Sequence, residues 1–383
     1  MAQPASGSRE PDPAPQPAAA PQDERDEWRD YEPGGASTSR NEAENAEEPP
    51  RVEEIVERMA ADLPRSGTEN LSEAETQPAH EEIVDPTQAV AQAMQRGVAT
   101  IAGASTGNAA SSLAGLCSAL GTQVVIFVPA SAPAAKLAQL RTYGALVVAV
   151  EGSYDQAFDL CLAATQRFGW YSRNTAYNPV LSEGKKTVSF EILEQRRWRA
   201  PDWIAVPVGD GCILGGVAKG LRDLQAVGLM DRMPRLLGVQ ATGSAALYNA
   251  WKAGSKEVAP VEPDTVADSI AVGQPRDAVK ALRGIADTDG AFVVVEDEAI
   301  LEAGHQLGYR AGVFAEPAAS AALAGTVAAK EQGLIGAADE VVVLATGNGL
   351  KDPLTSSQGT PAPVSVAPGE SSLDAVHDAL SAR

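Results

Sequence analysis

The chain has 383 residues, of which 44% are apolar, so it is long enough for a two-lobed globular body. Its formal net charge of −21 argues against nucleic-acid binding, because no basic stripe is present to displace counterions from phosphates. Three cysteines without CxxC spacing or a nearby histidine give no indication of disulfides or structural zinc. No signal-peptide pattern and no apolar run of membrane-spanning length occurs, so we expect a cytoplasmic protein without a membrane partner.

The acidic balance has two explanations. Strong surface charge keeps a protein soluble in a salt-rich cytosol, and a GC-rich genome combined with an acidic tail gives a similar composition. Residues 1–80 supply that tail, with 11 of the 26 prolines and 19 acidic residues against 7 arginines. Such a segment buries too little apolar surface to offset its ordering entropy, so we predict that it is disordered. The spacing of Val52, Ile55, Val56 and Met59 allows at most one short amphipathic turn.

From Thr87 the sequence alternates between strand and helix patterns. Continuous apolar strands separated by helices predict a parallel sheet covered by helices on both faces. We therefore assign residues 87–168 to a small α/β lobe. Its predicted helices are Ala89–Arg96, Asn108–Leu120, Pro133–Tyr143 and Tyr154–Phe168, and its predicted strands are Val98–Ala102, Val124–Val128 and Ala145–Val150.

A second α/β series follows and predicts a large lobe over residues 169–353. Residues 354–383 then form a Ser/Pro/Gly linker with a terminal helix, Ser372–Leu380. The large lobe has predicted strands Trp203–Val208, Leu236–Gln240, Phe292–Val295 and Val341–Ala345, and predicted helices starting at Ile213 and spanning Glu316–Glu331.

A glycine-rich turn, Gly209–Gly216, connects the strand at Trp203–Val208 to the next helix. Such a turn offers backbone N–H groups and the positive end of a helix dipole to an anion, and its glycines allow close approach. A plain tight turn is the alternative. The next strand ends at Ala241-Thr242 without a carboxylate for a ribose, and no Walker Lys-Ser/Thr pair follows. A small phosphorylated cofactor or substrate therefore fits better than NAD or ATP.

A second loop, Ser105–Asn108, also lies between a predicted strand and helix. Its hydroxyl groups suit helix capping, which is the interpretation favoured for this loop taken alone. The functional alternative is a loop that binds a carboxylate.

Five motifs occur in one order along the chain: Ser105–Asn108, Glu183–Thr187, Val208–Cys212, Glu316–Ala318 and Thr346–Pro353. Together they resemble the fold-type-II pyridoxal-phosphate enzymes, and the threonine synthase family most closely, over roughly residues 85–380. The resemblance implies a two-lobed fold with parallel sheets covered on both faces. It also implies conversion of a phosphorylated homoserine to threonine and phosphate, and a homodimer.

The resemblance also implies roles for matching residues. The substrate carboxylate would be bound by Ser105, Thr106 and Gly107. Asn108 would meet the ring hydroxyl oxygen of the cofactor, and Thr346 its ring nitrogen. Lys185 and Lys186 lie in a segment that edges the active site in relatives, without an assigned contact. The loop that would hold the cofactor phosphate consists of Val208, Gly209, Asp210, Gly211 and Cys212.

One departure from the family pattern concerns the lysine of a Ser-Phe-Lys-Asp-Arg stretch, which in relatives forms the Schiff base and moves the proton. The corresponding stretch here is His80–Asp85, and the first lysine of the chain is Lys136, which we expect at the surface as the default for lysine. We therefore assign no catalytic residue, and expect non-covalent cofactor binding, impaired catalysis and an incomplete large lobe. A non-catalytic pseudoenzyme and an interaction protein on the same fold are the alternatives.

Overall fold

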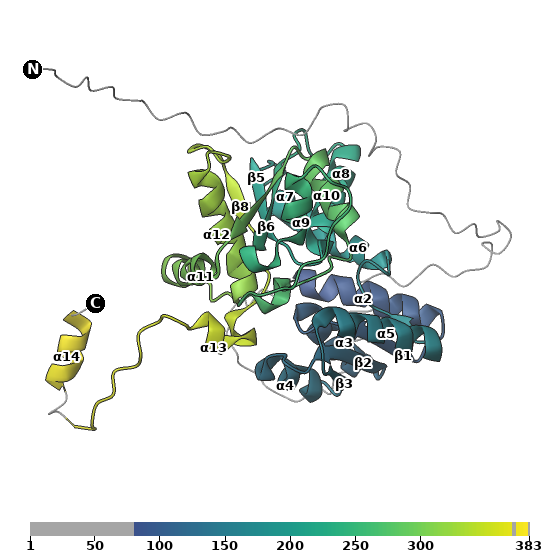
Figure 1. Cartoon of the computed structure of the whole chain (residues 1–383), viewed down its shortest axis with the longest axis horizontal. Coiled ribbons are helices and arrows are strands. Elements are labelled where there is room, and N and C mark those ends of the chain that lie inside the picture. Colours follow the sequence, from purple (N-terminus) through teal and green to yellow (C-terminus); the bar gives the residue numbers. More distant parts are fainter. Residues whose placement is uncertain (1–79, 370–372, 382–383) are drawn as a thin grey trace, which may run out of the picture. The chain divides into compact units, whose positions relative to one another are not determined.

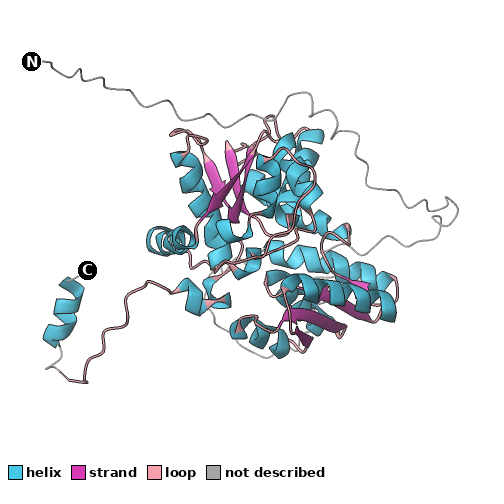
Figure 2. Cartoon of the chain, viewed as in Figure 1, coloured by secondary structure: helices cyan, strands magenta, loops and turns pink. Residues whose placement is uncertain are grey.

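A computed structural model describes residues 80–369 and 373–381 of the chain (Figure 1). The disorder predicted for residues 1–80 and the amphipathic turn lie outside the described part, except at His80, where the first described helix begins. Within the described part, two parallel sheets are each covered by helices on both faces (Figure 2). The fold class predicted from the strand and helix pattern is therefore confirmed.

The first sheet has the strand order β3-β2-β1-β4, and every pairing in it is parallel. Alternate residues of β2 face opposite layers: Ile126 packs in one core cluster and Phe127 in another. The two-residue strand β4 is absent from the predicted elements, and it extends this sheet past residue 168. The strands are β1 (Thr100–Ala104), β2 (Gln123–Pro129), β3 (Leu146–Val150) and β4 (Tyr171–Ser172).

Four helices cover this sheet. Residues of α2, α3 and α4 pack against one face, and residues of α5 pack against the other. A capping box formed by Ser153 and Gln156 starts α5, because each side chain accepts a hydrogen bond from the backbone N–H of the other residue. The helices are α2 (His80–Gln95), α3 (Asn108–Leu120), α4 (Ala134–Thr142) and α5 (Tyr154–Phe168).

The second sheet has the order β7-β6-β5-β8 and is also parallel throughout. Val206 of the central strand β5 packs with α7, α8 and α10, whereas its neighbour Ala205 packs with α11 and α12 on the opposite face. The strands are β5 (Trp203–Pro207), β6 (Arg235–Ala241), β7 (Ala291–Val295) and β8 (Val341–Val343).

Most of the remaining elements connect or cover the sheets, and no described helix is long and apolar enough to cross a membrane. The 3-10 turns are η2 (Thr242–Ser244), η3 (Asp268–Ile270) and η4 (Gly349–Lys351). The helices are α6 (Val180–Lys185), α7 (Thr187–Gln195), α8 (Cys212–Ala226), α9 (Ala246–Lys252), α10 (Ala278–Asp287), α11 (Asp297–Ala311), α12 (Pro317–Glu331), α13 (Pro353–Ser356) and α14 (Leu373–Ser381).

Candidate functional site

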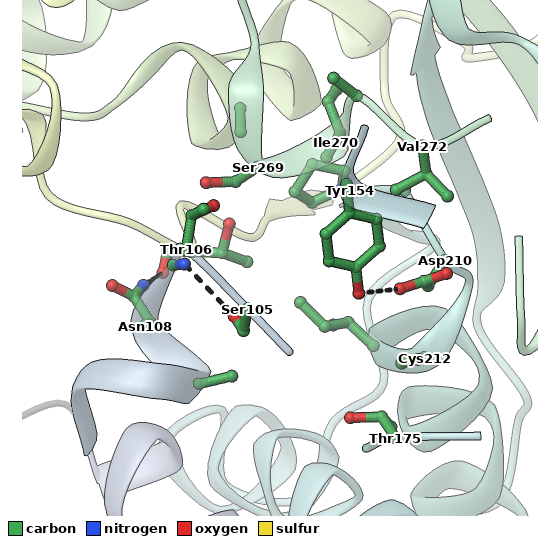
Figure 3. A pocket seen from close by; sticks show the side chains of 18 of the residues that line it. Ser105, Thr106, Asn108, Tyr154, Thr175, Asp210, Cys212, Ser269, Ile270 and Val272 are labelled. Atoms are coloured by element: carbon green, nitrogen blue, oxygen red, sulfur yellow. Dashed lines mark hydrogen bonds between the residues drawn. The ribbon is translucent and has the colours of Figure 1, made fainter. Parts of the chain in front are cut away.

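A cavity of about 250 Å³ is lined by residues from the carboxyl ends of β1, β2 and β5 and from the segment after β8 (Figure 3). All ten residues that the sequence predicts for the site line this cavity. They come from three segments far apart in the chain: Ser105–Asn108, Val208–Cys212 and Thr346. Because the carboxyl ends of parallel strands lie at one edge of each sheet, the strand–loop–helix order of these motifs brings them together.

The glycine turn at the start of α8 has the geometry of an anion cradle. Gly211 has φ +90°, and Gly209 approaches the η3 loop so closely that an added Cβ would lie 3.0 Å from Val272 Cγ2. The first hydrogen bond of the helix runs from Gly215 N–H to Gly211 O. Cys212, Ile213 and Leu214 precede Gly215 and line the cavity. Their backbone N–H groups therefore have no acceptor within the helix and suit an anion.

Asp210 uses both carboxylate oxygens to hold the turn in place. Oδ2 accepts a hydrogen bond from the hydroxyl group of Tyr154 on α5 at 3.0 Å (Figure 3). Oδ1 accepts a hydrogen bond from the backbone N–H of Arg276 at 3.0 Å. Burial raises the pKa of Asp210 to about 6, although these two hydrogen bonds favour the ionised form. The carboxylate thus links the glycine turn to both lobes.

The thiol of Cys212 lies at the first position of α8. Burial, followed by the charges of Asp277 and Asp210, holds its pKa well above the usual value, while the charge of Lys185 acts in the opposite direction. The thiol is therefore neutral and does not provide a nucleophile at neutral pH. All three cysteines of the chain are free.

The Ser105–Asn108 loop does not cap α3 with a side chain. Gly107 is the N-cap residue and receives no side-chain cap. Ser105 Oγ instead accepts the N–H of Gly107 at 3.2 Å, and Thr106 Oγ1 donates to Asp268 Oδ2 at 3.2 Å. The capping interpretation is therefore wrong, and the two hydroxyl groups order the loop and join it to η3.

Asn108 lines the cavity and has a buried polar atom without a hydrogen-bond partner. Its Nδ2 donates to the carbonyl oxygen of Thr346 at 2.5 Å. Its Oδ1 is buried and has no hydrogen-bond partner among the described residues. A buried acceptor of this kind is costly unless a ligand satisfies it.

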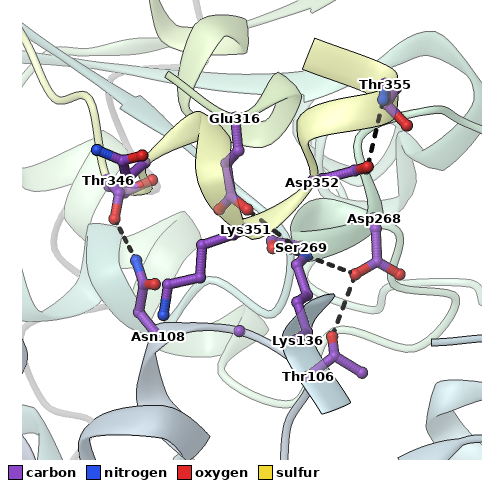
Figure 4. A network of polar contacts seen from close by, with 12 residues as sticks. Thr106, Asn108, Lys136, Asp268, Ser269, Glu316, Thr346, Lys351, Asp352 and Thr355 are labelled. Atoms are coloured by element: carbon purple, nitrogen blue, oxygen red, sulfur yellow. Dashed lines mark hydrogen bonds and ion pairs between the residues drawn. The ribbon is translucent and has the colours of Figure 1, made fainter. Parts of the chain in front are cut away.

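Lys136 is buried, which corrects the surface position expected for it. Its side chain is only 1% exposed, and Nζ lies 2.8 Å from Asp268 Oδ2 and 3.5 Å from Glu316 Oε2 (Figure 4). Burial alone would lower the pKa of Lys136, but the charges of Glu316 and Asp268 outweigh it and raise the pKa. No sequence pattern signals this pairing, because the three residues lie on separate elements.

Residues 86–347 match the family model described as "Pyridoxal-phosphate dependent enzyme", and the chain belongs to this family. It is similar to the threonine synthase of Methanocaldococcus jannaschii, with 35% identity over 282 residues, or 73% of this chain and 69% of the relative. Identity to the threonine synthase of Methanosarcina acetivorans is 36% over 296 residues, or 77% and 72% of the two chains.

Solved structures share the fold at lower identity. A pyridoxal 5'-phosphate-dependent aspartate racemase superposes with a TM-score of 0.60 at 22% identity, covering 70% of this chain and 80% of the racemase. The processed form of threonine deaminase isoform 2 from Solanum lycopersicum superposes with a TM-score of 0.58 at 22% identity, covering 70% and 75% of the two chains. Pyridoxal phosphate is the cofactor of this family. The residues of the cavity fit it, since they combine the backbone amides at the start of α8 with the unpartnered Oδ1 of Asn108. A Cβ at Gly211 would lie 2.8 Å from Ala281 Cβ, so the turn before these amides requires a glycine.

Proposed function

We propose that the chain is an enzyme domain of the threonine synthase type, with a phosphorylated homoserine as substrate and threonine and phosphate as products. The observation that carries this proposal is the convergence of the three predicted loops on one cavity. The similarity to threonine synthases over more than two thirds of each chain supports the substrate class. A homodimer and a cytoplasmic location are part of the same proposal.

The residues of the cavity divide the work among them. The amides at the start of α8 bind the cofactor phosphate, and Asn108 lies beside the ring hydroxyl. Thr346 provides a neutral partner for the ring nitrogen, and Ser105, Thr106 and Gly107 orient the substrate carboxylate. When bound, pyridoxal phosphate supplies an electron sink that stabilises negative charge on the carbon next to the substrate amine.

We propose that no lysine carries the proton in this site, so that catalysis is impaired. All nine lysines of the chain lie between Lys136 and Lys351, within the described residues. Lys185 is the one lysine among the residues that line the cavity. The stretch His80–Asp85, which takes the place of the family's lysine motif, contains none.

The test combines binding, trapping and turnover on the full chain. We expect pyridoxal phosphate to bind with a stoichiometry of about one per chain, as one cradle requires. Borohydride reduction followed by peptide mapping should give only scattered surface labelling, and phosphate release from O-phosphohomoserine should be far slower than for an active threonine synthase. Absence of binding would refute the cofactor site. A single stoichiometric adduct with rapid threonine formation would refute the impairment.

The alternative is a non-catalytic protein that binds the cofactor or a related ligand on the same fold. The lack of a lysine in His80–Asp85 favours it. Stoichiometric binding of pyridoxal phosphate without any phosphate release would decide for this alternative.

A further inference from the structure

Lys185 is the last residue of α6, and its side chain is seated against the start of α8. The residue is 8% exposed and lines the cavity with the glycine turn. Gly216, in the second turn of α8, leaves room for it, because a Cβ built on Gly216 would lie 2.5 Å from Lys185 Cβ. The packing of α6 on α8 therefore depends on a glycine at the point where the lysine stem passes.

The charge of Lys185 acts on the amino-terminal end of α8. The positive charge of Lys185 acts to lower the pKa of the Cys212 thiol, because it stabilises negative charge at the first residue of α8. Asp210 places a carboxylate in the same turn. The other two carboxylates of the lining, Asp268 and Glu316, are ion-paired with Lys136.

The adjacent lysine has a different environment. Lys186 is 22% exposed, and its Nζ lies 2.7 Å from Glu183 Oε2 and 2.9 Å from Asp223 Oδ2 in a partly exposed network. Lys186 does not line the cavity. The two neighbouring lysines of the Glu183–Thr187 motif therefore have separate roles, and Lys186 provides a matched control.

We propose that Lys185 is the cationic partner of the cofactor phosphate, binding it together with the backbone amides at the start of α8. This inference rests on the cofactor site proposed above. A phosphate dianion beside Asp210 needs more positive charge than the helix end supplies, which is equivalent to roughly half an elementary charge. An ammonium group supplies a full charge and a charge-assisted hydrogen bond to a phosphate oxygen.

The experiment compares pyridoxal phosphate with pyridoxal, which lacks the phosphate. Binding of both is measured by equilibrium dialysis for the wild type, Lys185→Met, Lys185→Arg and Lys186→Met. We expect Lys185→Met to weaken binding of pyridoxal phosphate by roughly 10- to 100-fold, the usual effect of losing a hydrogen bond to a charged group. Pyridoxal binding should not change in this variant. Lys185→Arg should retain most of the affinity for pyridoxal phosphate, and Lys186→Met should match the wild type for both compounds.

Several results would overturn the inference. Wild-type affinity for pyridoxal phosphate in Lys185→Met, or an equal loss for pyridoxal, would show that Lys185 does not act on the phosphate. A borohydride-reduced adduct on Lys185 would show that it acts on the aldehyde instead. Methionine retains the packing of the aliphatic part of the lysine side chain, so Lys185→Met should fold. If Lys185→Met nevertheless fails to fold, Lys185→Arg provides the test, and a loss of affinity for pyridoxal phosphate but not for pyridoxal in this variant would count against the proposal. A wild type that binds no pyridoxal phosphate would refute both the cofactor site and this role, whereas unaltered binding in Lys185→Met would refute only the role.

Discussion

Asp210 affects both the geometry of the glycine turn and the stability of the fold. Its carboxylate is held by Tyr154 on one lobe and by the backbone of Arg276 on the other. Even so, burial outweighs these bonds and raises its pKa from 3.8 to about 6. A carboxyl group that is harder to ionise in the folded chain destabilises that chain once it is ionised.

The pH dependence of stability follows from the direction of this shift. Below about pH 4 the group is protonated in both the folded and the unfolded chain. Between pH 3.8 and about 6 the unfolded chain releases the proton first, so the contribution of Asp210 to stability decreases as pH rises. The pKa shift from 3.8 to about 6 corresponds to a decrease of at most about 3 kcal/mol. Solvent screening makes the decrease smaller, because the side chain is partly exposed.

We therefore expect Asp210→Asn, which mimics the protonated group, to gain stability relative to the wild type as pH rises from about 4 to above 6. Urea unfolding of both proteins across this range measures the difference, and subtraction removes the other titrating groups. The difference should level off above the folded-state pKa of Asp210. A stability difference that is constant over the whole range would contradict the raised pKa.

At the scale of elements, α8 is bounded by two glycines that both have positive φ but differ in their surroundings. At Gly211, which precedes the helix, an added Cβ would lie 2.8 Å from Ala281 Cβ and 3.1 Å from Asp277 O. At Gly228, after the helix, an added Cβ would have no heavy atom within 4 Å. The first position needs both the left-handed backbone and the space, whereas the second needs only the backbone.

Gly211→Ala and Gly228→Ala therefore form a matched pair. In each variant the left-handed conformation costs about 1 kcal/mol of stability. Only Gly211→Ala also has to move the start of α8 away from Asp277 and Ala281, so we expect at least about a tenfold loss of affinity for pyridoxal phosphate, with preserved circular dichroism. Gly228→Ala should bind like the wild type. Equal affinities in the two variants would mean that the Gly209–Gly216 turn is only a plain connection between strand and helix.

The elements with long apolar runs could be predicted from the sequence, and the site elements only in part. Helices α3 and α5 begin and end at the predicted residues, because apolar spacing and adjacent glycines define them. Strand β4 has only two residues, too few to produce a periodic pattern. The residue motifs located the cavity, but the burial of Lys136 and the contact from Tyr154 depend on tertiary packing that no local pattern encodes.

At the scale of the whole molecule, η3 is one of the places where side chains join the two lobes. Thr106 and Lys136, from the first lobe, both bind Asp268 of this turn, and Lys136 also pairs with Glu316 at the start of α12. The carboxylate of Glu316 is 5% exposed, so removal of Lys136 would leave a buried charge without its partner. These contacts join the Ser105–Asn108 loop and α4 of one lobe to η3 and the start of α12 in the other.

The second sheet ends at β8, and its outer edge has consequences for association. Val341–Val343 pairs with β5 on one side, and among the described residues no strand pairs with its other side. The N–H of Leu344 donates to Ala205 O at 3.0 Å. Because amide directions alternate along a strand, the N–H of Val343 points away from β5, toward the unpaired edge. An edge of this kind is a template for pairing with another chain.

Amide hydrogen exchange tests this edge against two internal references. Val206 lies in β5 between β6 and β8, and Val125 lies in β2 between β1 and β3, so both amides are enclosed and should exchange slowly. We expect the amide of Val343 to exchange much faster in a protein shown to be monomeric by sedimentation. If the edge mediates association, exchange at Val343 should slow as protein concentration increases, while exchange at Val125 stays constant. Slow exchange at Val343 in a verified monomer would mean that another segment of the chain covers β8, so that the large lobe is complete.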